Sequence, residues 1–492
     1  ILLARYFEER RLGHNADDAL VIAMENTVVA TFGASSTTVV SFAIFLLAEV
    51  KSFSQFGFIG GIGILLIYVA SYTMLPALIM LSEKIHPSVA NPDKKLLADR
   101  INLGFMTWPL RYPRAVLATF AVLAVASAVL FARFLPDSLE YNMSNLRTKS
   151  SLHSGTAKLN ERVSALFDVS MTPAVLLAET PEEGREICKT LLADKKKKGD
   201  ASGIENCRSI FSFLPDNQPD KLEVIRELRK MLADSSLGFL TDEQKRQVED
   251  LKKSLPKKPL TINDVPKELA RAYTDKDGNL GMLVFVYPRA GRDLWNSVNL
   301  HRFTDDIRKI TLPDGKVISS SGEAVIFEDL LSLMKRDSPI ATTASFTGVL
   351  LLVLLTFGSW RSSKFVAGSL LVGSLLMVGL MALFRIKMNF FNFVALPMTF
   401  GIGVDYSINI YQRYLLEGPG SMDKVLRRTG TAVILCSLTT VIGYFTLIIA
   451  DSNALVSLGA LAIMGEFTCL GSAMIMLPAL VVWTENRKAK TP

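Results

Sequence analysis

Runs of about 20 apolar residues recur along most of the chain, and one long polar block separates an earlier group from a later group. A run of that length allows a single helix to cross a membrane. The pattern therefore predicts an α-helical polytopic membrane bundle of about eight spans. We expect two spans in residues 27–82, one in 115–134, two in 339–384, one in 388–414 and two in 429–484.

The polar block at residues 135–338 predicts an α/β domain outside the membrane. The expected strands cover 171–179, 209–214, 280–288 and 317–321, and the expected helices cover 181–198, 294–310 and 323–336. A helical insertion at 219–275 interrupts this pattern, and without it the order is β-α-β followed by β-α-β-α. That order is typical of a ferredoxin-like domain.

The remaining segments are predicted to lie at the membrane surface. We expect residues 1–26 to form a helix end and a charged loop, residues 83–114 an amphipathic interfacial helix, and residues 485–492 a cytoplasmic tail. The chain begins with Ile inside a helix-like run, so we expect it to be part of a longer protein. Lys and Arg concentrate in loops on the tail's side, which places the large domain in the periplasm of a Gram-negative cell.

The net charge of +7 invites a nucleic-acid interpretation, but the positive-inside rule explains the basic loops better. A GxxxxGK[ST] motif is missing from the sequence, so ATP is not the expected energy source. The four histidines lack metal-ligand spacing, and no Ser/His/Asp arrangement is visible. We therefore expect no enzyme activity, no metal, no cofactor and no nucleic-acid partner.

One predicted span carries an acid, Asp405, in the stretch FFNFVALPMTFGIGVDYSINIY at 390–411. A charged side chain at the bilayer centre costs roughly 2.5–3.5 kcal/mol even on lenient insertion scales. Such a residue is expected to face a partner or a pathway. Burial favours the neutral form of a carboxyl group, so a carboxylate there can bind a proton. We interpret Asp405 as a proton site. The alternative is a buried acid that is paired only for structure.

Small residues surround Asp405 on the same predicted helix. Gly401, Asp405 and Asn409 recur every four residues and share one face, which suits close packing against another helix. Gly403 extends this packing surface, and Pro397 predicts either a hinge or a static kink.

Cysteines and a second acid leave alternatives open. Cys188 and Cys207 lie in the polar block, where an extracytoplasmic location would allow a disulfide; otherwise they are two buried thiols. Glu466 lies in the last predicted pair of spans. Proton transfer, snorkelling toward the interface and structural pairing are all compatible with its position.

The membrane part contains an internal repeat, because residues 27–83 match residues 429–485 at a constant offset. The matches include Thr37-Thr38-Val39 with Thr439-Thr440-Val441, LPAL at 75–78 with LPAL at 477–480, and Glu83 with Glu485. Upstream, Arg5-Tyr6 matches Arg413-Tyr414 after a small gap. The chain is therefore expected to be the later part of a duplicated protein, an arrangement known among transporters.

These features together resemble the RND superfamily of proton-driven exporters. The resemblance rests on GIGVDYSINIYQRY, the following helix with two threonines, the duplication and the position of the soluble domain. The Asp-Tyr pair is similar to that of MmpL-type lipid exporters, and LEYNMSNLRTKSS and SFLPDNQPDKLEVI are similar to the hopanoid transporters among them. The resemblance covers essentially the whole chain and numbers the spans TM5 to TM12, with residues 1–6 as the end of TM4.

The resemblance implies a proton relay in which Asp405 and Tyr406 on TM10 form one pair. Thr439 or Thr440 on TM11 is then a hydrogen-bonding neighbour of that pair. Either threonine could instead bond a carbonyl of its own helix.

Other residues are assigned to the surroundings of the relay. Thr37 and Thr38 on TM5 would serve the corresponding pair in the missing first half. Tyr444 shares a face of TM11 with Thr440 and, like Glu466, is a candidate neighbour of the relay.

The resemblance also implies a function, with protons as the coupling ion. The protein would export a hydrophobic, hopanoid-like lipid from the bacterial inner membrane toward the outer membrane. Expected partners are the lipid, the membrane, the missing N-terminal half and further copies in a dimer or trimer. The alternatives are an RND drug efflux pump, an auxiliary subunit of protein export and a lipid sensor that does not transport. The lipid's identity and the oligomeric state stay open.

Overall fold

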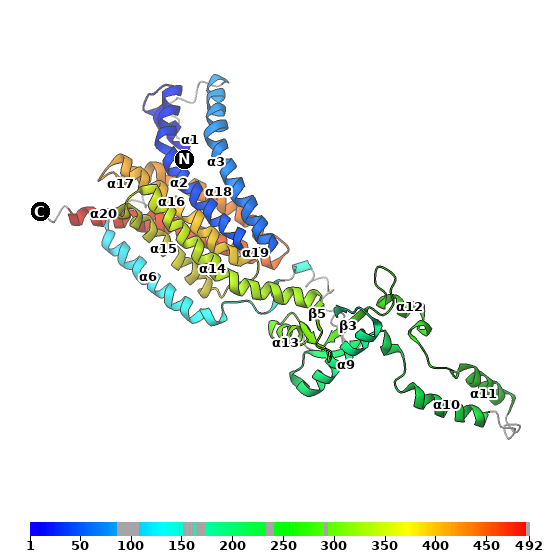
Figure 1. The fold of residues 1–492 in the computed structure, drawn as a ribbon. Coiled ribbons are helices and arrows are strands. Elements are labelled where there is room, and N and C mark those ends of the chain that lie inside the picture. The colour runs from blue at the N-terminus through cyan, green and yellow to red at the C-terminus, as the bar shows by residue number, and fades with distance from the viewer. Residues whose placement is uncertain are drawn as a thin grey trace. The chain divides into compact units, whose positions relative to one another are not determined.

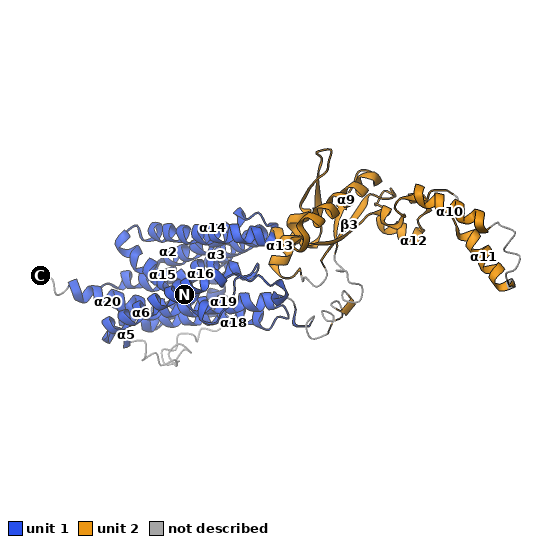
Figure 2. Ribbon diagram, turned by 90° about the horizontal axis from the view of Figure 1, so that it is seen from below, with its two compact units in different colours: residues 1–151, 330–492 blue, residues 152–329 orange. Residues whose placement is uncertain are grey.

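The computed structural model describes residues 1–85, 108–146, 148–150, 155, 159, 162–163, 173–232, 241–256, 258–289 and 294–488. The chain divides into two compact units, of which unit 1 contains residues 1–151 and 330–492 and unit 2 contains residues 152–329 (Figure 1, Figure 2). The boundary between them falls within α14 (Glu323–Phe357), so a single helix belongs to both units.

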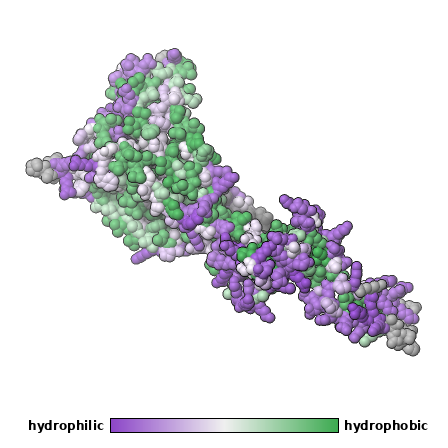
Figure 3. Space-filling view, in the orientation of Figure 1, coloured by the Kyte–Doolittle hydropathy of each residue, from purple (hydrophilic) through white to green (hydrophobic). Residues whose placement is uncertain are grey.

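Unit 1 is a bundle of membrane-length helices. Eight of the described helical segments are long and apolar enough to span a membrane, which agrees with the predicted number. Besides α14, the helices of unit 1 are α1 (Leu2–Arg11), α2 (Ala16–Ala43), α3 (Lys51–Ile85), α5 (Trp108–Arg111), α6 (Pro113–Phe134), α15 (Trp360–Leu383), α16 (Ala395–Glu417), α17 (Met422–Val425), α18 (Thr431–Ile448), α19 (Asn453–Gly471) and α20 (Leu477–Lys488). Figure 3 shows apolar side chains over the face of this bundle that is in view.

One predicted boundary of unit 1 differs from the structure. The expected loop within residues 1–26 shrinks to residues 12–15, because Asn15 caps α2 by accepting a hydrogen bond from the backbone N–H of Asp18 at 2.7 Å. The predicted interfacial helix at 83–114 lies largely outside the described residues.

The soluble block is also shorter than the predicted 135–338. Residues before 151 bond to loops of unit 1; for example, the backbone N–H of Glu140 donates to the carbonyl oxygen of Met388 at 2.7 Å. Ser150 likewise donates its backbone N–H to Asp451 at 3.0 Å. These contacts assign the segment to the membrane unit although its composition is polar.

Helix α16 lies at the centre of unit 1. In its most apolar stretch 78% of the residues are buried, against 11% in α3 and in α6. It packs against α2, α15 and α19, whereas α3 and α6 expose most of their surface. The helix that carries Asp405 is therefore a core element, and α3 and α6 are suited to face lipid.

Pro397 is the third residue of α16, which begins later than the predicted span. The first four N–H groups of a helix have no intrahelical partner. A proline there consequently removes no helical hydrogen bond. This position is typical of a helix start, and it differs from the mid-helix hinge or kink that we expected.

Unit 2 contains a five-stranded antiparallel sheet in the order β2-β3-β1-β5-β4. The strands are β1 (Ala174–Leu177), β2 (Ile204–Arg208), β3 (Leu283–Pro288), β4 (Lys309–Thr311) and β5 (Val317–Ser321). Helix α9 (Pro181–Lys198) connects β1 to β2, and α13 (Ser297–Ile307) follows β3. This connectivity confirms the ferredoxin-like class.

The second strand lies earlier than predicted. Residues 209–214, which we expected to be extended, contain a 3₁₀ turn at Ile210–Phe213. Ser209 and Ser212 stabilise this turn with a capping box, in which the backbone N–H of Ser209 donates to Oγ of Ser212 at 3.1 Å. Local side-chain hydrogen bonds therefore outweigh the strand propensity of the apolar residues.

The insertion between β2 and β3 contains helices α10 (Gln218–Leu232), α11 (Asp242–Ser254) and α12 (Lys267–Ala270). Before it, Cys188 of α9 and Cys207 of β2 form a disulfide, with Cα atoms 5.3 Å apart. The structure thus has the disulfide and not the two separate thiols. The bond joins a helix to the strand against which it packs.

Candidate functional site

Asp405 lies near the middle of its span and accepts hydrogen bonds from two threonines of α2. Oγ1 of Thr37 donates to Oδ1 at 3.2 Å, and Oγ1 of Thr38 donates to Oδ2 at 3.3 Å. Both hydroxyls also reach the carbonyl oxygen of Ala34, at 2.7 and 3.2 Å, and Thr38 reaches that of Gly401 at 3.2 Å. Each hydroxyl therefore has another acceptor when the carboxyl changes its protonation state.

Glycines bring α16 close to both of its neighbours at this level. A Cβ atom added to Gly401 would lie 2.9 Å from Cα of Thr38 and 2.7 Å from Oγ of Ser41 on α2. A Cβ atom added to Gly403 would lie 2.5 Å from Sγ of Cys469 on α19. The predicted packing surface is therefore two-sided, and α16 is held between α2 and α19.

Tyr406 faces a different helix from Asp405, because successive residues of an α-helix are turned by about 100°. Its hydroxyl donates a hydrogen bond to Oε1 of Glu466 on α19. Tyr406 is 3% exposed and Glu466 is 4% exposed, whereas Asp405 retains partial exposure. Burial and pairing exclude surface snorkelling for Glu466 and leave proton transfer and structural pairing.

The threonines of α18 occupy a different environment from the one that the resemblance implied. Thr439 and Thr440 donate to the carbonyl oxygen of Cys436 in their own helix, at 2.7 and 3.2 Å. Tyr444 has no hydrogen-bond partner among the described residues. The hydrogen-bonding neighbours of Asp405 are instead the α2 threonines, which we had assigned to the missing half. The first helix of one repeat thus packs against the acid-bearing helix of the other.

This geometry predicts a cross-link. With Cys436 and Cys469 replaced by Ala, we expect the pair Thr37→Cys and Asp405→Cys to form a disulfide on mild oxidation, because their side chains are in contact. The control pair Thr439→Cys and Asp405→Cys should stay reduced. Mass spectrometry of non-reduced peptides measures both, and preferential bridging of the control pair would contradict the arrangement.

A pocket of about 350 Å³ between α1, α2, α16 and α18 approaches this site. It reaches Asn409, which lies one turn, roughly 6 Å, from Asp405 along α16. Nδ2 of Asn409 donates to the backbone oxygen of Asp405 at 2.8 Å, while its buried Oδ1 has no partner in the described part of the chain. A buried acceptor beside a cavity is suited to a water molecule. The pocket therefore offers water a route to within one turn of Asp405.

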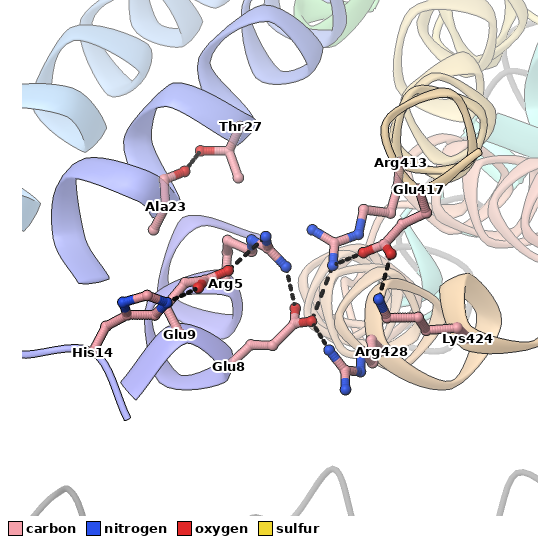
Figure 4. Close-up of polar contacts among 10 residues, drawn as sticks. All are labelled: Arg5, Glu8, Glu9, His14, Ala23, Thr27, Arg413, Glu417, Lys424 and Arg428. Carbon is pink, nitrogen blue, oxygen red and sulfur yellow. Dashed lines mark hydrogen bonds and ion pairs between the residues drawn. The ribbon is translucent and has the colours of Figure 1, made fainter. Parts of the chain in front are cut away.

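Charged residues that line this pocket form ion pairs with one another (Figure 4). Glu8 of α1 pairs with Arg5 at 2.9 Å, with Arg413 of α16 at 3.0 Å and with Arg428 just before α18. Burial raises the pKa of Glu8, but the nearby guanidinium groups of Arg413, Arg428 and Arg5 outweigh it and hold this pKa below its usual value. Glu8 is therefore charged at neutral pH and ties α1 to the second repeat.

Several contacts inside the first repeat recur inside the second. The hydroxyl of Tyr6 donates to Oε1 of Glu83 at 2.7 Å, and that of Tyr414 donates to Oε1 of Glu485 at 2.5 Å. An ion pair also occurs in both repeats, as Arg5–Glu9 in the first and Arg413–Glu417 in the second, each at 2.5 Å. These matched contacts support the internal repeat.

Sequence reasoning did not single out the bridge from Glu8 to Arg413 and Arg428. The sequence nevertheless contains a sign of it, because Glu8 is not repeated: Leu416 stands at the matching position of the second repeat.

The carboxyls and hydroxyls of the site can hold and exchange protons. No group of three or more His, Cys, Asp or Glu that could hold a metal ion occurs among the residues that the structure describes.

Known proteins show similarity over most of the chain. It is 22% identical to the hopanoid transporter HpnN of Rhodopseudomonas palustris over 558 aligned positions, which cover 97% of this chain and 58% of that protein. It is 27% identical over 235 residues to a membrane protein of Methanocaldococcus jannaschii, MJ1562, covering 46% of this chain and 60% of that protein. The chain thus spans about 60% of the length of these relatives.

Solved structures share the fold at lower identity. The crystal structure of SecDF, a translocon-associated membrane protein from Thermus thermophilus, matches 99% of this chain and 52% of its own, with a TM-score of 0.54 and 16% identity. SecDF in its super-membrane-facing form gives a TM-score of 0.51 at 16% identity. The model of the MMPL family matches residues 1–121 and 230–492. Since this match covers most of the chain, the chain belongs to the MMPL family.

Proposed function

We propose that the protein uses the proton-motive force to export a hydrophobic, hopanoid-like lipid from the bacterial inner membrane toward the outer membrane. The observation that carries the proposal is Asp405 in the centre of the bundle, hydrogen-bonded to Thr37 and Thr38 of the other repeat. An intramembrane acid with hydroxyl partners is typical of a proton relay. MMPL membership and the similarity to a hopanoid transporter support the choice of lipid.

Protonation at Asp405 changes the contact between the two repeats. The carboxylate only accepts hydrogen bonds, whereas the neutral carboxyl also donates one. Gly401 leaves no space between α16 and α2, so a change in their hydrogen bonds is transmitted to the helix packing. Proton binding would thereby favour one of two arrangements of the repeats.

The pocket and the Glu8 bridge would control one end of the proton route. The pocket would bring water close to Asp405, and the ion pairs of Glu8 with Arg413 and Arg428 hold the repeats together where these residues line it. Opening that end would require these pairs to separate. The disulfide of unit 2 supports a periplasmic location, because disulfides persist in oxidising compartments.

A transport assay tests the proposal. The full-length protein in lipid vesicles that contain a radiolabelled hopanoid should transfer the hopanoid to acceptor vesicles faster when a pH gradient is imposed. A gradient of one pH unit corresponds to about a tenfold concentration ratio for one proton per lipid. A protonophore should remove the stimulation. The proposal would be contradicted if the protonophore left the rate of hopanoid transfer unchanged. It would also be contradicted if the pH gradient stimulated only the transport of a cationic dye or of an exported polypeptide.

A further inference from the structure

A second pocket lies where α6 begins, at the end of that helix away from the segment that continues to unit 2. Its volume is about 920 Å³. Helices α5, α6 and α20 lie side by side around it (Figure 2). The polar and aromatic residues that line it are Arg111, Tyr112, Arg114, Trp483, Asn486 and Arg487.

The charge of this pocket is of one sign. Three guanidinium groups line it, and none of the described lining residues carries a carboxylate. Several other arginines of unit 1 pair with acids, as Arg10 does with Glu83 at 3.1 Å. Arg111 and Arg114, in contrast, form no ion pair with any described residue. The described residues that line this pocket therefore supply positive charge and no carboxylate, which suits an anion.

The surroundings place this site at the membrane interface. Tyr112 is 58% exposed and Trp108 is 53% exposed, and the guanidinium of Arg487 lies 5.6 Å from the ring centre of Trp483. Exposed Tyr and Trp beside arginines are typical of the headgroup level of a bilayer. From the pocket α6 continues as an apolar surface with exposed side chains such as Val122. An anion that fits both the basic pocket and the apolar surface of α6 has a charged head and apolar chains.

We propose that this pocket binds the phosphate of an anionic phospholipid, whose acyl chains lie along α6. Guanidinium groups match phosphate oxygens in geometry as well as in charge. Basic pockets between transmembrane helices at a membrane surface are suited to anionic headgroups. The site is separate from Asp405 and would act as a lipid anchor on the outer surface of the bundle.

The test titrates the full-length protein in detergent with short-chain phosphatidylglycerol or phosphatidylcholine and counts bound lipid by native mass spectrometry. The variant combines Arg111→Gln, Arg114→Gln and Arg487→Gln. Each lost arginine should weaken phosphatidylglycerol binding about fivefold, so the triple variant should lose about a hundredfold. A matched control, Lys84→Gln with Arg361→Gln and Lys364→Gln, removes three exposed charges outside the pocket and should bind like the unaltered protein.

Three outcomes would overturn the proposal. Equal weakening of the variant and the control would mean that diffuse charge attracts the lipid. Equal binding of phosphatidylcholine would mean that the headgroup charge is not recognised. Inorganic phosphate that displaces phosphatidylglycerol at the lipid's own concentration would identify a soluble phosphate as the ligand. Thermal unfolding of both triple variants checks that their folds are unchanged.

Discussion

Asp405→Asn is expected to abolish proton-driven transport while the protein stays folded. Asparagine has nearly the same shape, and its side-chain oxygen can accept the hydrogen bond of one of the two threonines, Thr37 or Thr38. The other threonine can donate to the carbonyl oxygen of Ala34 instead. The amide cannot take up or release a proton at this position, so the contact between α2 and α16 no longer responds to the gradient. Hopanoid transfer should fall to the rate measured with the protonophore. The concentration ratio of about ten that a gradient of one pH unit can sustain should be lost.

A matched variant shows whether the loss belongs to this acid. Glu49→Gln removes an exposed carboxylate of the same unit, which pairs with Arg336 at 2.7 Å. Exposed ion pairs contribute only about 0–1 kcal/mol, so this variant should transport normally. Gradient-stimulated transfer by Asp405→Asn at the unaltered rate would exclude Asp405 as the proton site.

Gly401→Leu should separate α2 from α16 and destabilise the bundle. The new Cβ atom alone would lie 2.9 Å from Cα of Thr38, and a backbone atom cannot rotate away as a side chain can. Overpacking typically costs about 1–3 kcal/mol, and a clash with backbone belongs at the upper end of that range. The thermal unfolding midpoint of the purified protein should therefore fall by several degrees.

Gly443→Leu provides the control for this substitution. Gly443 lies in α18, and a Cβ atom added there meets no other atom within 4 Å. Its unfolding midpoint should stay close to that of the unaltered protein. Equal midpoints for Gly401→Leu and Gly443→Leu would show that α2 and α16 are not in contact at Gly401.

The membrane spans and the position of Asp405 were predictable because both depend on the transfer free energy of nearby residues between water and the membrane. Leaving some 20 apolar residues in water is unfavourable, and so is placing a carboxylate in hydrocarbon. Helix ends were less predictable, because they depend on capping hydrogen bonds, which the hydropathy of the sequence does not show. Asn15 starts α2 well before its apolar stretch, and Pro397 marks the first turn of α16 within an apolar run.

The partners across the bundle were not predictable from one sequence. Periodicity showed that Gly401, Asp405 and Asn409 share a face, but not which helix that face meets. The repeat made Thr37 and Thr439 equivalent in sequence, yet only the crossing of the repeats decides which of them reaches Asp405. Contacts between residues hundreds of positions apart depend on how the helices are arranged in the fold, and local sequence patterns carry no information about that arrangement.

Some contacts of the first repeat recur in the second, and others do not. A gene duplication copies every contact inside the duplicated segment, so Tyr6–Glu83 and Tyr414–Glu485 descend from one ancestral pair. The bridge from Glu8 to Arg428 has no twin, because Leu416 and Asn26 stand at the matching positions. After the duplication the copies therefore kept these two contacts, and they came to differ at Glu8 and Arg428, where one copy meets the other.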